Sequence, residues 1–327
     1  MSRESKLPKI IAIIGATATG KTALAVRLAR ELNGEIVSAD SRQVYRGMDL
    51  GTGKDLAEYG SGRDAVPYYL IDVAKPQQQF DLNSYQKQAY AAIDDILRRG
   101  KLPILVGGSG LYVQAIVDGY VLSETASAKT ATSRAELTLK DLQSRVKQLD
   151  PAFFKKLNPS DQKNHRRLLR YLEILSDSQK SHDALHGKSK PRYDCLVIGV
   201  EASIETIRKN IKKRLNDRFK AGMIEEVERL HDKGLSWERL EAFGLEYKFI
   251  AQYLQALESR ARGNNRKKEG NAGLKDMQDK LAIASGQFAK RQLSWFRRWE
   301  KQGREVLWLR KTAYKKVAES IRLFLEN

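Results

Sequence analysis

Short runs of apolar residues recur along the chain and predict the strands of a buried sheet. Residues 9–14 (KIIAII), 103–106 (PILV) and 194–200 (DCLVIGV) are rich in β-branched side chains and lack polar alternation. Continuous apolar runs of this length are typical of strands that are covered on both faces of a parallel sheet. Further strands are expected at residues 35–38, 68–73 and 305–309.

Apolar residues spaced by three and four predict helices between these strands. One helix follows residue 22, and Asp81 or Asn83 can cap another that ends near Arg99. Later helices are expected at residues 111–117, 203–230 and 276–299. Strands that alternate with helices indicate an α/β fold, in which a parallel sheet is flanked by helices.

Residues 123–191 interrupt this alternation. They contain no convincing strand, and their leucines have rough helical spacing. We therefore expect a helical insertion domain at 123–191 and a core formed by residues 1–122 and 192–327. Residues 259–273 (SRARGNNRKKEGNAG) are polar and basic, which favours a loop.

A glycine-rich segment between the first strand and the first helix matches the phosphate-binding loop G-x-x-x-x-G-K-[ST]. Its residues are Gly15, Ala16, Thr17, Ala18, Thr19, Gly20, Lys21 and Thr22. The order strand, loop, helix directs backbone N–H groups towards an anion, so a chance glycine turn is the weaker interpretation. The motif predicts a P-loop NTPase-like core, with Lys21 on the outer phosphate and the Thr22 hydroxyl on Mg²⁺.

Two further segments follow predicted strands. Asp40 comes directly after residues 35–38, and the carboxyl ends of parallel strands line the ligand crevice of an open sheet. A site role is therefore favoured over a simple turn cap, the common alternative for Asp before Ser. The glycines around Ser109, after residues 103–106, suggest a close approach of backbone to ligand.

The charge of the chain indicates a polyanionic partner. Lys and Arg number 59 against 40 Asp and Glu, which gives a formal net charge of +19. Such an excess favours nucleic acid over a membrane surface. The single cysteine, Cys195, excludes an internal disulfide and a multi-cysteine zinc site. Neither a signal peptide nor a transmembrane stretch is recognisable, so we expect a cytoplasmic protein without membrane contact.

Several motifs together resemble those of the bacterial tRNA dimethylallyltransferases, over nearly the whole chain. They are GATATGKT, SADSRQVYRGMDLGTGKD, LIDV, ILVGGSGLYVQA, RFKAGMIEEVERL and KRQLSWF. The second of these is the most diagnostic, because the phosphate loop is shared with many kinases and GTPases. Some positions depart from the usual family pattern, namely Ala16, Thr19, Gly53, Asp55, Ser109 and the segment 243–247.

The resemblance implies transfer of a dimethylallyl group from dimethylallyl diphosphate, or from a hydroxylated analogue, to the exocyclic N6 amine of an adenosine next to the anticodon. The product would be N6-isopentenyladenosine in tRNA. Asp40 would be the general base, while Lys21 and Arg218 would hold the diphosphate and Ser109 would hydrogen-bond at the reacting centre. The phosphate loop would bind the prenyl diphosphate with Mg²⁺.

The resemblance also implies contacts to the anticodon stem-loop of tRNA, with a monomer as the acting species. The residues at matching positions are Asp40, Ser41, Arg42, Gln43, Ser109, Arg134, Arg166, Arg167, Arg170, Phe243 and Gly244. Two other functions stay open: an adenylate isopentenyltransferase that accepts a free nucleotide, and a phosphate-loop kinase of small molecules. A non-catalytic RNA-binding module is disfavoured by the intact Gly-Lys-Thr and Asp40.

Overall fold

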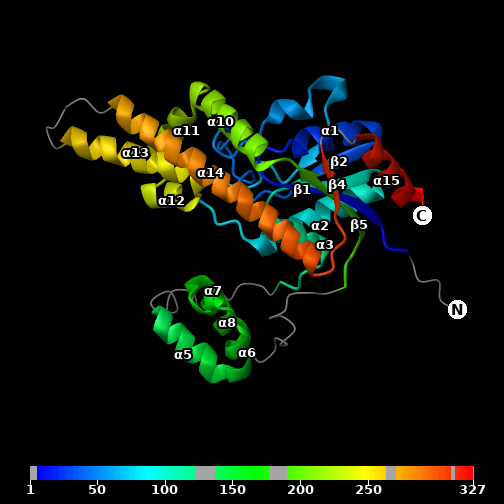
Figure 1. The fold of residues 1–327 in the computed structure, drawn as a ribbon, viewed down its shortest axis with the longest axis horizontal. Helices are drawn as coiled ribbons and strands as arrows, with labels where there is room; N and C mark the ends of the chain where they lie inside the picture. The colour runs from blue at the N-terminus through cyan, green and yellow to red at the C-terminus, as the bar shows by residue number, and fades with distance from the viewer. Residues whose placement is uncertain (1–5, 123–136, 177–189, 263–269, 311–313, 327) are drawn as a thin grey trace. The chain divides into compact units, whose positions relative to one another are not determined.

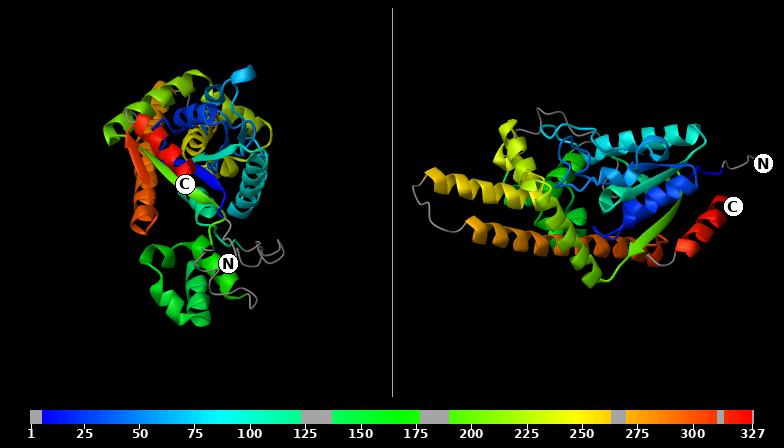
Figure 2. Two further views of the ribbon diagram at one scale, coloured as in Figure 1. Left: turned by 90° about the vertical axis from the view of Figure 1, so that its right-hand side faces the viewer. Right: turned by 90° about the horizontal axis from the view of Figure 1, so that it is seen from above.

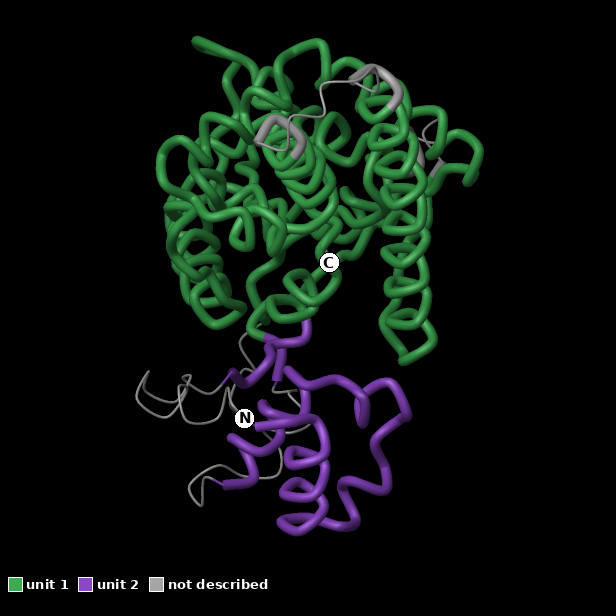
Figure 3. Tube along the Cα trace, turned by 90° about the vertical axis from the view of Figure 1, so that its left-hand side faces the viewer, with its two compact units in different colours: residues 1–117, 192–327 green, residues 118–191 purple. Residues whose placement is uncertain are grey.

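The structure is a computed structural model of the 327-residue chain. It describes residues 6–122, 137–176, 190–262, 270–310 and 314–326. The chain divides into two compact units, which Figure 3 distinguishes by colour. The core unit comprises Met1–Val117 and Arg192–Asn327, and the helical unit comprises Asp118–Pro191.

The core unit is built on a parallel sheet of six strands, in the order β3-β2-β4-β1-β5-β6 (Figure 1). The strands are β1 (Lys9–Gly15), β2 (Gly34–Ser38), β3 (Tyr68–Tyr69), β4 (Leu102–Gly107), β5 (Asp194–Glu201) and β6 (Leu307–Arg310). Central β1 pairs Ile11 with Ile104 of β4 and with Leu196 of β5. The α/β class with a parallel sheet is thus confirmed.

Side chains alternate between two buried faces of the sheet, because successive residues of a strand point to opposite sides. Ile10 and Ile14 of β1 pack with α2 (Leu82–Arg98), α3 (Gly110–Val117) and the end of α14 (Gly270–Lys301). Ile11 and Ile13 pack on the other face, with α1 (Lys21–Glu31) and α15 (Tyr314–Glu326). Each central strand is therefore covered on both faces, as its continuous apolar run predicted.

Further helices pack on one another beyond the sheet and form a third hydrophobic cluster. They are α10 (Ile204–Lys220), α11 (Met223–Asp232), α12 (Trp237–Ala242), α13 (Leu245–Arg262) and α14. Figure 2 shows α13 and α14 lying side by side. Tyr45 and Met48 belong to this cluster, so the segment after β2 is packed between the sheet and the helices. No helix in the described ranges is long and apolar enough to cross a membrane.

The helical unit has a small core of its own. Its described helices are α5 (Leu139–Leu149), α6 (Pro151–Lys156), α7 (Pro159–Gln162) and α8 (His165–Leu175). Leu142 and Val146 of α5 pack against Leu168 and Leu172 of α8. Thr138 and Asp141 form a capping box at the start of α5, which satisfies backbone N–H groups that the helix leaves unpaired.

Three expectations from the apolar pattern were wrong in extent. The strand expected at 68–73 ends at Tyr69, because Leu70 (φ 64°) and Asp72 (φ 57°) adopt left-handed conformations. The helix expected at 203–230 is interrupted at Gly222, whose φ of 96° separates α10 from α11. The loop expected at 259–273 is shorter, since α13 extends to Arg262 and α14 begins at Gly270; residues 263–269 lie outside the described ranges.

A buried carboxylate fastens the edge of the sheet. Glu35 of β2 is 1% exposed and accepts hydrogen bonds from the Arg99 guanidinium (2.6 Å), the Lys101 ammonium (2.6 Å) and the Tyr69 hydroxyl (2.7 Å). These partners, Arg99 foremost, lower the pKa of Glu35 to about 2. The charged form is therefore the one that stabilises the fold.

Replacing Glu35 by Gln is expected to lower the free energy of unfolding by about 2–3 kcal/mol, the usual contribution of hydrogen bonds to a charged group. Because the folded-state pKa is depressed from 4.5 to about 2, this contribution is complete above pH 4.5 and is lost as the pH falls towards 2. Chemical denaturation of wild type and variant over this pH range measures both effects.

Glu31→Gln is the control, since Glu31 pairs with Arg27 on an exposed turn of α1. Its effect should stay within about 0.5 kcal/mol. Equal stability of Glu35→Gln and wild type at neutral pH would contradict the role given to the buried cluster.

Candidate active site

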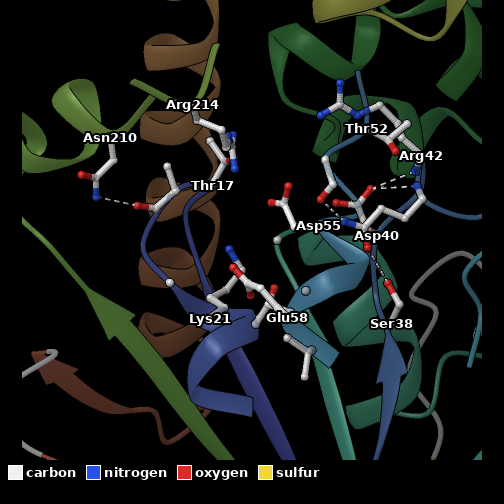
Figure 4. Close-up of a pocket in the computed structure, with 18 of the residues that line it drawn as sticks. Thr17, Lys21, Ser38, Asp40, Arg42, Thr52, Asp55, Glu58, Asn210 and Arg214 are labelled. Atoms are coloured by element: carbon white, nitrogen blue, oxygen red, sulfur yellow. Dashed lines mark hydrogen bonds between the residues drawn. The ribbon is translucent and has the colours of Figure 1, made fainter. Parts of the chain in front are cut away.

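A cavity of about 410 Å³ opens where β1, β2 and β4 end. Its wall includes the loop after β1, Asp40 after β2 and one face of α10 (Figure 4). Gly107 at the end of β4 and the following Gly108 also line it. Residues of the segment 52–59, of α13 and of α14 also contribute to the lining. Ligands of open parallel sheets bind at this edge, so the cavity is the candidate active site.

The loop from Gly15 to Thr22 owes its shape to two glycines. Gly15 (φ 148°) lies so close to β5 that a Cβ there would approach the Val200 carbonyl oxygen to 2.7 Å. Gly20 (φ 85°) directly precedes α1 in a left-handed conformation. The Thr19 hydroxyl is buried and donates to the Ala16 carbonyl (2.9 Å) within the loop. Gly20, Lys21 and Thr22 line the cavity, so the N-terminus of α1 faces it and could bind an anion there.

Helix α10 lies over this loop and contributes residues spaced four apart, which share one helical face. Asn210 Nδ2 donates to the Ala18 carbonyl (3.0 Å), and Arg214 Nη2 donates to Thr17 Oγ1 (2.5 Å). Arg218, one turn further along, is buried and also lines the cavity. The spacing places two guanidinium groups beside the phosphate loop; Arg214 had not been identified from the sequence.

Burial outweighs the nearby opposite charges at two cations beside the loop, Lys21 and Arg214. Lys21 Nζ donates to the Ala16 carbonyl at 2.6 Å, and burial together with nearby Arg214 lowers the pKa of Lys21 to about 8. Burial, followed by the charge of Arg218, lowers the pKa of Arg214 to about 10. Arg214 Nε is buried and has no hydrogen-bond acceptor in the described structure. An anion bound here would raise the pKa values of both Lys21 and Arg214, because opposite charge favours their charged forms.

Gln292 of α14 connects the two glycine-rich loops. Its Oε1 accepts from Thr17 N (2.8 Å) and its Nε2 donates to the Gly108 carbonyl (2.9 Å). A Cβ on Gly108 would overlap Gln292, and one on Gly110 would overlap Trp295. At these two glycines the backbone approaches α14 closely. Gly108 also lines the cavity, so an approach of this turn to a ligand stays a prediction.

Asp40 both closes a turn and lines the cavity. Its Oδ1 accepts from the backbone N–H of Arg42 (2.9 Å) and of Gln43 (3.4 Å). Ser109 Oγ accepts from Ser41 N (3.2 Å), so the second glycine turn lies against the segment that carries Asp40. Lys21, Asp40 and Arg218 line one cavity, whereas Ser41 and Ser109 are not among the residues that line it.

The next residues are largely engaged with the protein itself. Arg42 Nη1 pairs with Glu246 Oε2 at 2.7 Å; burial opposes its charge, but Glu246 and Asp40 outweigh burial and raise the pKa of Arg42. The Gln43 side chain accepts from Ser38 Oγ and donates to the Gly53 carbonyl. Arg42 and Gln43 nevertheless line the cavity.

The segment 243–247 packs against the loop that follows β2. Phe243 lies edge-on to Tyr45 at 4.9 Å, and Gly244 (φ 76°) forms the turn before α13. Neither lines the cavity, while Glu246 does. A contact of Phe243 and Gly244 with tRNA thus remains a prediction, and Glu246 had not been identified from the sequence.

A buried carboxylate on α11 anchors the loop 49–53. Glu226 accepts hydrogen bonds from Asp49 N (2.9 Å), Leu50 N (2.8 Å) and Gly51 N (3.1 Å), and from the Tyr247 hydroxyl (2.6 Å). Lys54 is also buried and bonds the Tyr45 carbonyl and Asp49. Lys54 is consequently a structural lysine: it is bonded within the protein and is not among the residues that line the cavity. Such roles depend on tertiary contacts that sequence spacing does not reveal.

The arginines of the helical unit differ in their surroundings. Arg166 of α8 is exposed and has no ion pair within the described part of that unit. Arg167 pairs with Asp161, and Arg170 pairs with Glu173 at 3.2 Å. Arg134 lies outside the described residues. Arg166 is therefore the arginine of this helix most available to a phosphate.

The cavity fits a magnesium ion that is shared with a phosphate ligand. Thr22 lines it and offers a hydroxyl oxygen. Among the described residues, no group of three or more His, Cys, Asp or Glu side chains could hold a metal. Mg²⁺ is commonly held by few protein ligands together with substrate phosphates, so a single threonine is compatible with that arrangement.

Known proteins resemble this chain over almost all of its length. The "tRNA dimethylallyltransferase 2" of Treponema denticola is 45% identical over 307 residues, which cover 92% of this chain and 95% of that protein. The "tRNA dimethylallyltransferase 1" of Syntrophus aciditrophicus is 41% identical over 317 residues, with 97% and 98% covered.

Solved structures agree with these relatives. The tRNA isopentenylpyrophosphate transferase of Bacillus halodurans has 30% identity and a TM-score of 0.66, with 97% of each chain covered. A eukaryotic dimethylallyltransferase acting on tRNA has 22% identity and a TM-score of 0.79 over 98% of this chain and 80% of that one, which shows the shared fold. The sequence pattern described as IPP transferase matches residues 43–299. The chain therefore belongs to the IPP transferase family.

Proposed function

We propose that the protein transfers a dimethylallyl group from dimethylallyl diphosphate to the N6 amine of an adenosine next to the anticodon in tRNA. One observation carries this proposal: a single cavity combines the phosphate loop and the cations Lys21, Arg214 and Arg218 with the carboxylate of Asp40. Relatives that cover 92% and 97% of the chain are named tRNA dimethylallyltransferase, which supports this proposal.

The cations suit the departing diphosphate. As the bond between the allylic carbon and oxygen breaks, negative charge grows on the diphosphate and positive charge on the allyl carbon. Lys21, Arg214 and Arg218 would stabilise the growing negative charge, since all three line the cavity. A guanidinium offers several donors in a fixed fork, which matches phosphate oxygens better than an ammonium does. Mg²⁺ bound with Thr22 would supply further Lewis-acid stabilisation.

Asp40 suits the acceptor. The adenine amine is a poor nucleophile, because its lone pair is delocalised into the ring. Asp40 would accept a hydrogen bond from the amine and take its proton as the carbon–nitrogen bond forms. The hydrogen bonds from Arg42 N and Gln43 N to Oδ1 fix the carboxylate in place. The base must leave the RNA stack to reach this site.

The choice of donor tests the proposal against a phosphate-loop kinase. Incubation of the protein with Mg²⁺, ATP, labelled dimethylallyl diphosphate and an anticodon stem-loop should consume the allylic donor and leave ATP intact. Release of diphosphate and labelling of the RNA should occur in equal amounts. Consumption of ATP with the allylic donor unchanged would support the kinase instead.

The variant Asp40→Asn tests the general base. It keeps the hydrogen bonds of Oδ1 to the turn but cannot accept the proton, so single-turnover transfer should slow by about 10²–10⁴-fold. Donor and stem-loop affinity should remain near those of the wild type. Near-normal single-turnover transfer by this variant would exclude Asp40 as the base.

The pH dependence of donor binding tests Lys21. The pKa of Lys21 is about 8 in the free protein, and a bound diphosphate should raise it because opposite charge favours the ammonium. Affinity is then constant below pH 8 and decreases above it, by up to about tenfold per pH unit. The phosphates are already ionised in this range, since their second pKa lies near 6.

Calorimetric titration with dimethylallyl diphosphate between about pH 6.5 and 9 measures this dependence, starting below the free-protein pKa. Lys21→Met should bind more weakly and show a flatter profile. A wild-type affinity that stays constant across the range would show that Lys21 does not contact the diphosphate.

The helical unit is proposed to bind the anticodon stem. Arg166→Ala should raise the KM for tRNA and reduce the slope of log affinity against log salt by somewhat under about one unit, as expected for one lost phosphate contact. Donor affinity should not change. Arg98→Ala, which removes an exposed arginine of α2, is the matched control. Efficient transfer to AMP by the wild type, or unaltered stem-loop binding by Arg166→Ala, would contradict this role.

A further inference from the structure

Asp55 forms an ion pair with Arg218 inside the candidate active site. Arg218 Nη2 lies 3.1 Å from Asp55 Oδ2 and 3.3 Å from Oδ1. One nitrogen thus serves both carboxylate oxygens, which is not the two-pronged pairing that makes arginine–carboxylate contacts strong. The Arg218 side chain is 6% exposed, whereas that of Asp55 is 45% exposed. The pair consists of a fixed cation and a carboxylate in contact with solvent.

The loop that carries Asp55 is shaped to reach Arg218. Gly53 (φ 68°) lies against the guanidinium, and a Cβ at this position would overlap Arg218 Nη2. Asp55 itself has a φ of 40°, in the left-handed region that only glycine, asparagine and aspartate adopt readily. Glu226 anchors the preceding residues of this loop. Backbone geometry that is unfavourable for most residues therefore places a carboxylate beside Arg218.

This carboxylate occupies a place where a phosphate is expected. Arg218 is a cause of the lowered pKa of Arg214, and Asp55 partly opposes that effect. Figure 4 shows Asp55 projecting between the side of the cavity that carries Thr17 and Lys21 and the side that carries Asp40. A diphosphate carries more charge than a carboxylate and can engage Lys21, Arg214 and Arg218 together. The diphosphate can displace the Asp55 carboxylate from Arg218, because the Asp55 side chain is exposed and can be hydrated instead.

We propose that Asp55 is an internal competitor for Arg218, which the diphosphate displaces on binding and which recovers the guanidinium when the diphosphate product leaves. The proposal rests on the function proposed above. It makes Asp55 a positioning residue that weakens binding of donor and product alike. Its benefit is faster release of a diphosphate that would otherwise remain bound to Lys21, Arg214 and Arg218.

A different role for Asp55 would change the affinity for diphosphate in the opposite direction when its charge is removed. If its carboxylate held Mg²⁺ beside the diphosphate, removing the charge would weaken binding. If Asp55 competes for Arg218, removing the charge strengthens binding. The direction of the change in affinity therefore separates the two roles.

The test is calorimetric titration of the full chain with inorganic diphosphate, with and without Mg²⁺. Asp55→Asn is the main variant, because asparagine keeps the shape and tolerates the left-handed backbone. It should bind diphosphate about two- to fivefold more tightly than wild type, as expected for the loss of one partly exposed ion pair. Asp55→Gly, which suits the same φ, should show the same direction of change.

Two comparisons isolate the competition. Glu58→Gln removes an equal charge from the same cavity wall, and it should strengthen binding by less than half as much as Asp55→Asn. In an Arg218→Ala background, the effect of Asp55→Asn should fall to that of Glu58→Gln, because the group for which Asp55 competes is absent and only the general effect of its charge on the cavity remains. The rate of diphosphate release in rapid-mixing experiments should decrease in Asp55→Asn.

The outcomes distinguish this proposal from the proposed function. If wild type and variants all fail to bind diphosphate, both are wrong. If wild type binds diphosphate and Asp55→Asn binds equally or more weakly, the competitor role is wrong and the proposed function stands. An effect of Asp55→Asn that keeps its full size in the Arg218→Ala background would likewise exclude competition for Arg218.

Discussion

The candidate site depends on two cations, Lys21 and Arg214, whose charge is opposed by burial more strongly than the nearby carboxylates favour it. Lys21 at the start of α1, and Arg214 and Arg218 on α10, are brought to the same cavity at the edge of the sheet. Burial of cations without full compensation is unfavourable, and the lowered pKa values of Lys21 and Arg214 are its signature. An anion bound in the cavity would stabilise the charged forms of Lys21 and Arg214.

Much of the surrounding structure holds this cavity in shape. Gln292 of α14 joins the phosphate loop to the loop after β4, and Glu226 of α11 fixes the loop that ends at Asp55. Both side chains satisfy backbone groups that would otherwise be buried without partners. The helices beyond the sheet are therefore part of the site and not only a cover for the core. Their positions determine where Arg214, Arg218 and Glu246 lie in the wall of the cavity.

The sequence predicted the central strands well and the loops poorly. Residues 9–14 and 103–106 are apolar throughout because β1 and β4 are buried on both faces, and that signal is local. The break at Gly222 was missed because the apolar spacing of α10 continues into α11. Lys21, Asp40 and Arg218 were named from motifs and do line one cavity. Glu226, Gln292 and Arg214 act through contacts between distant segments, so no spacing in the sequence could indicate their partners.

Mass analysis of nucleosides tests the proposed activity most directly. Bulk tRNA lacking the modification is incubated with the protein, Mg²⁺ and dimethylallyl diphosphate, then digested and compared with a sample from which the protein was omitted. The proposed function predicts a new adenosine that carries one isopentenyl group on N6, located in fragments that adjoin the anticodon. Unmodified tRNA together with prenylated AMP, or no prenylated nucleoside under conditions where the protein binds diphosphate, would contradict it.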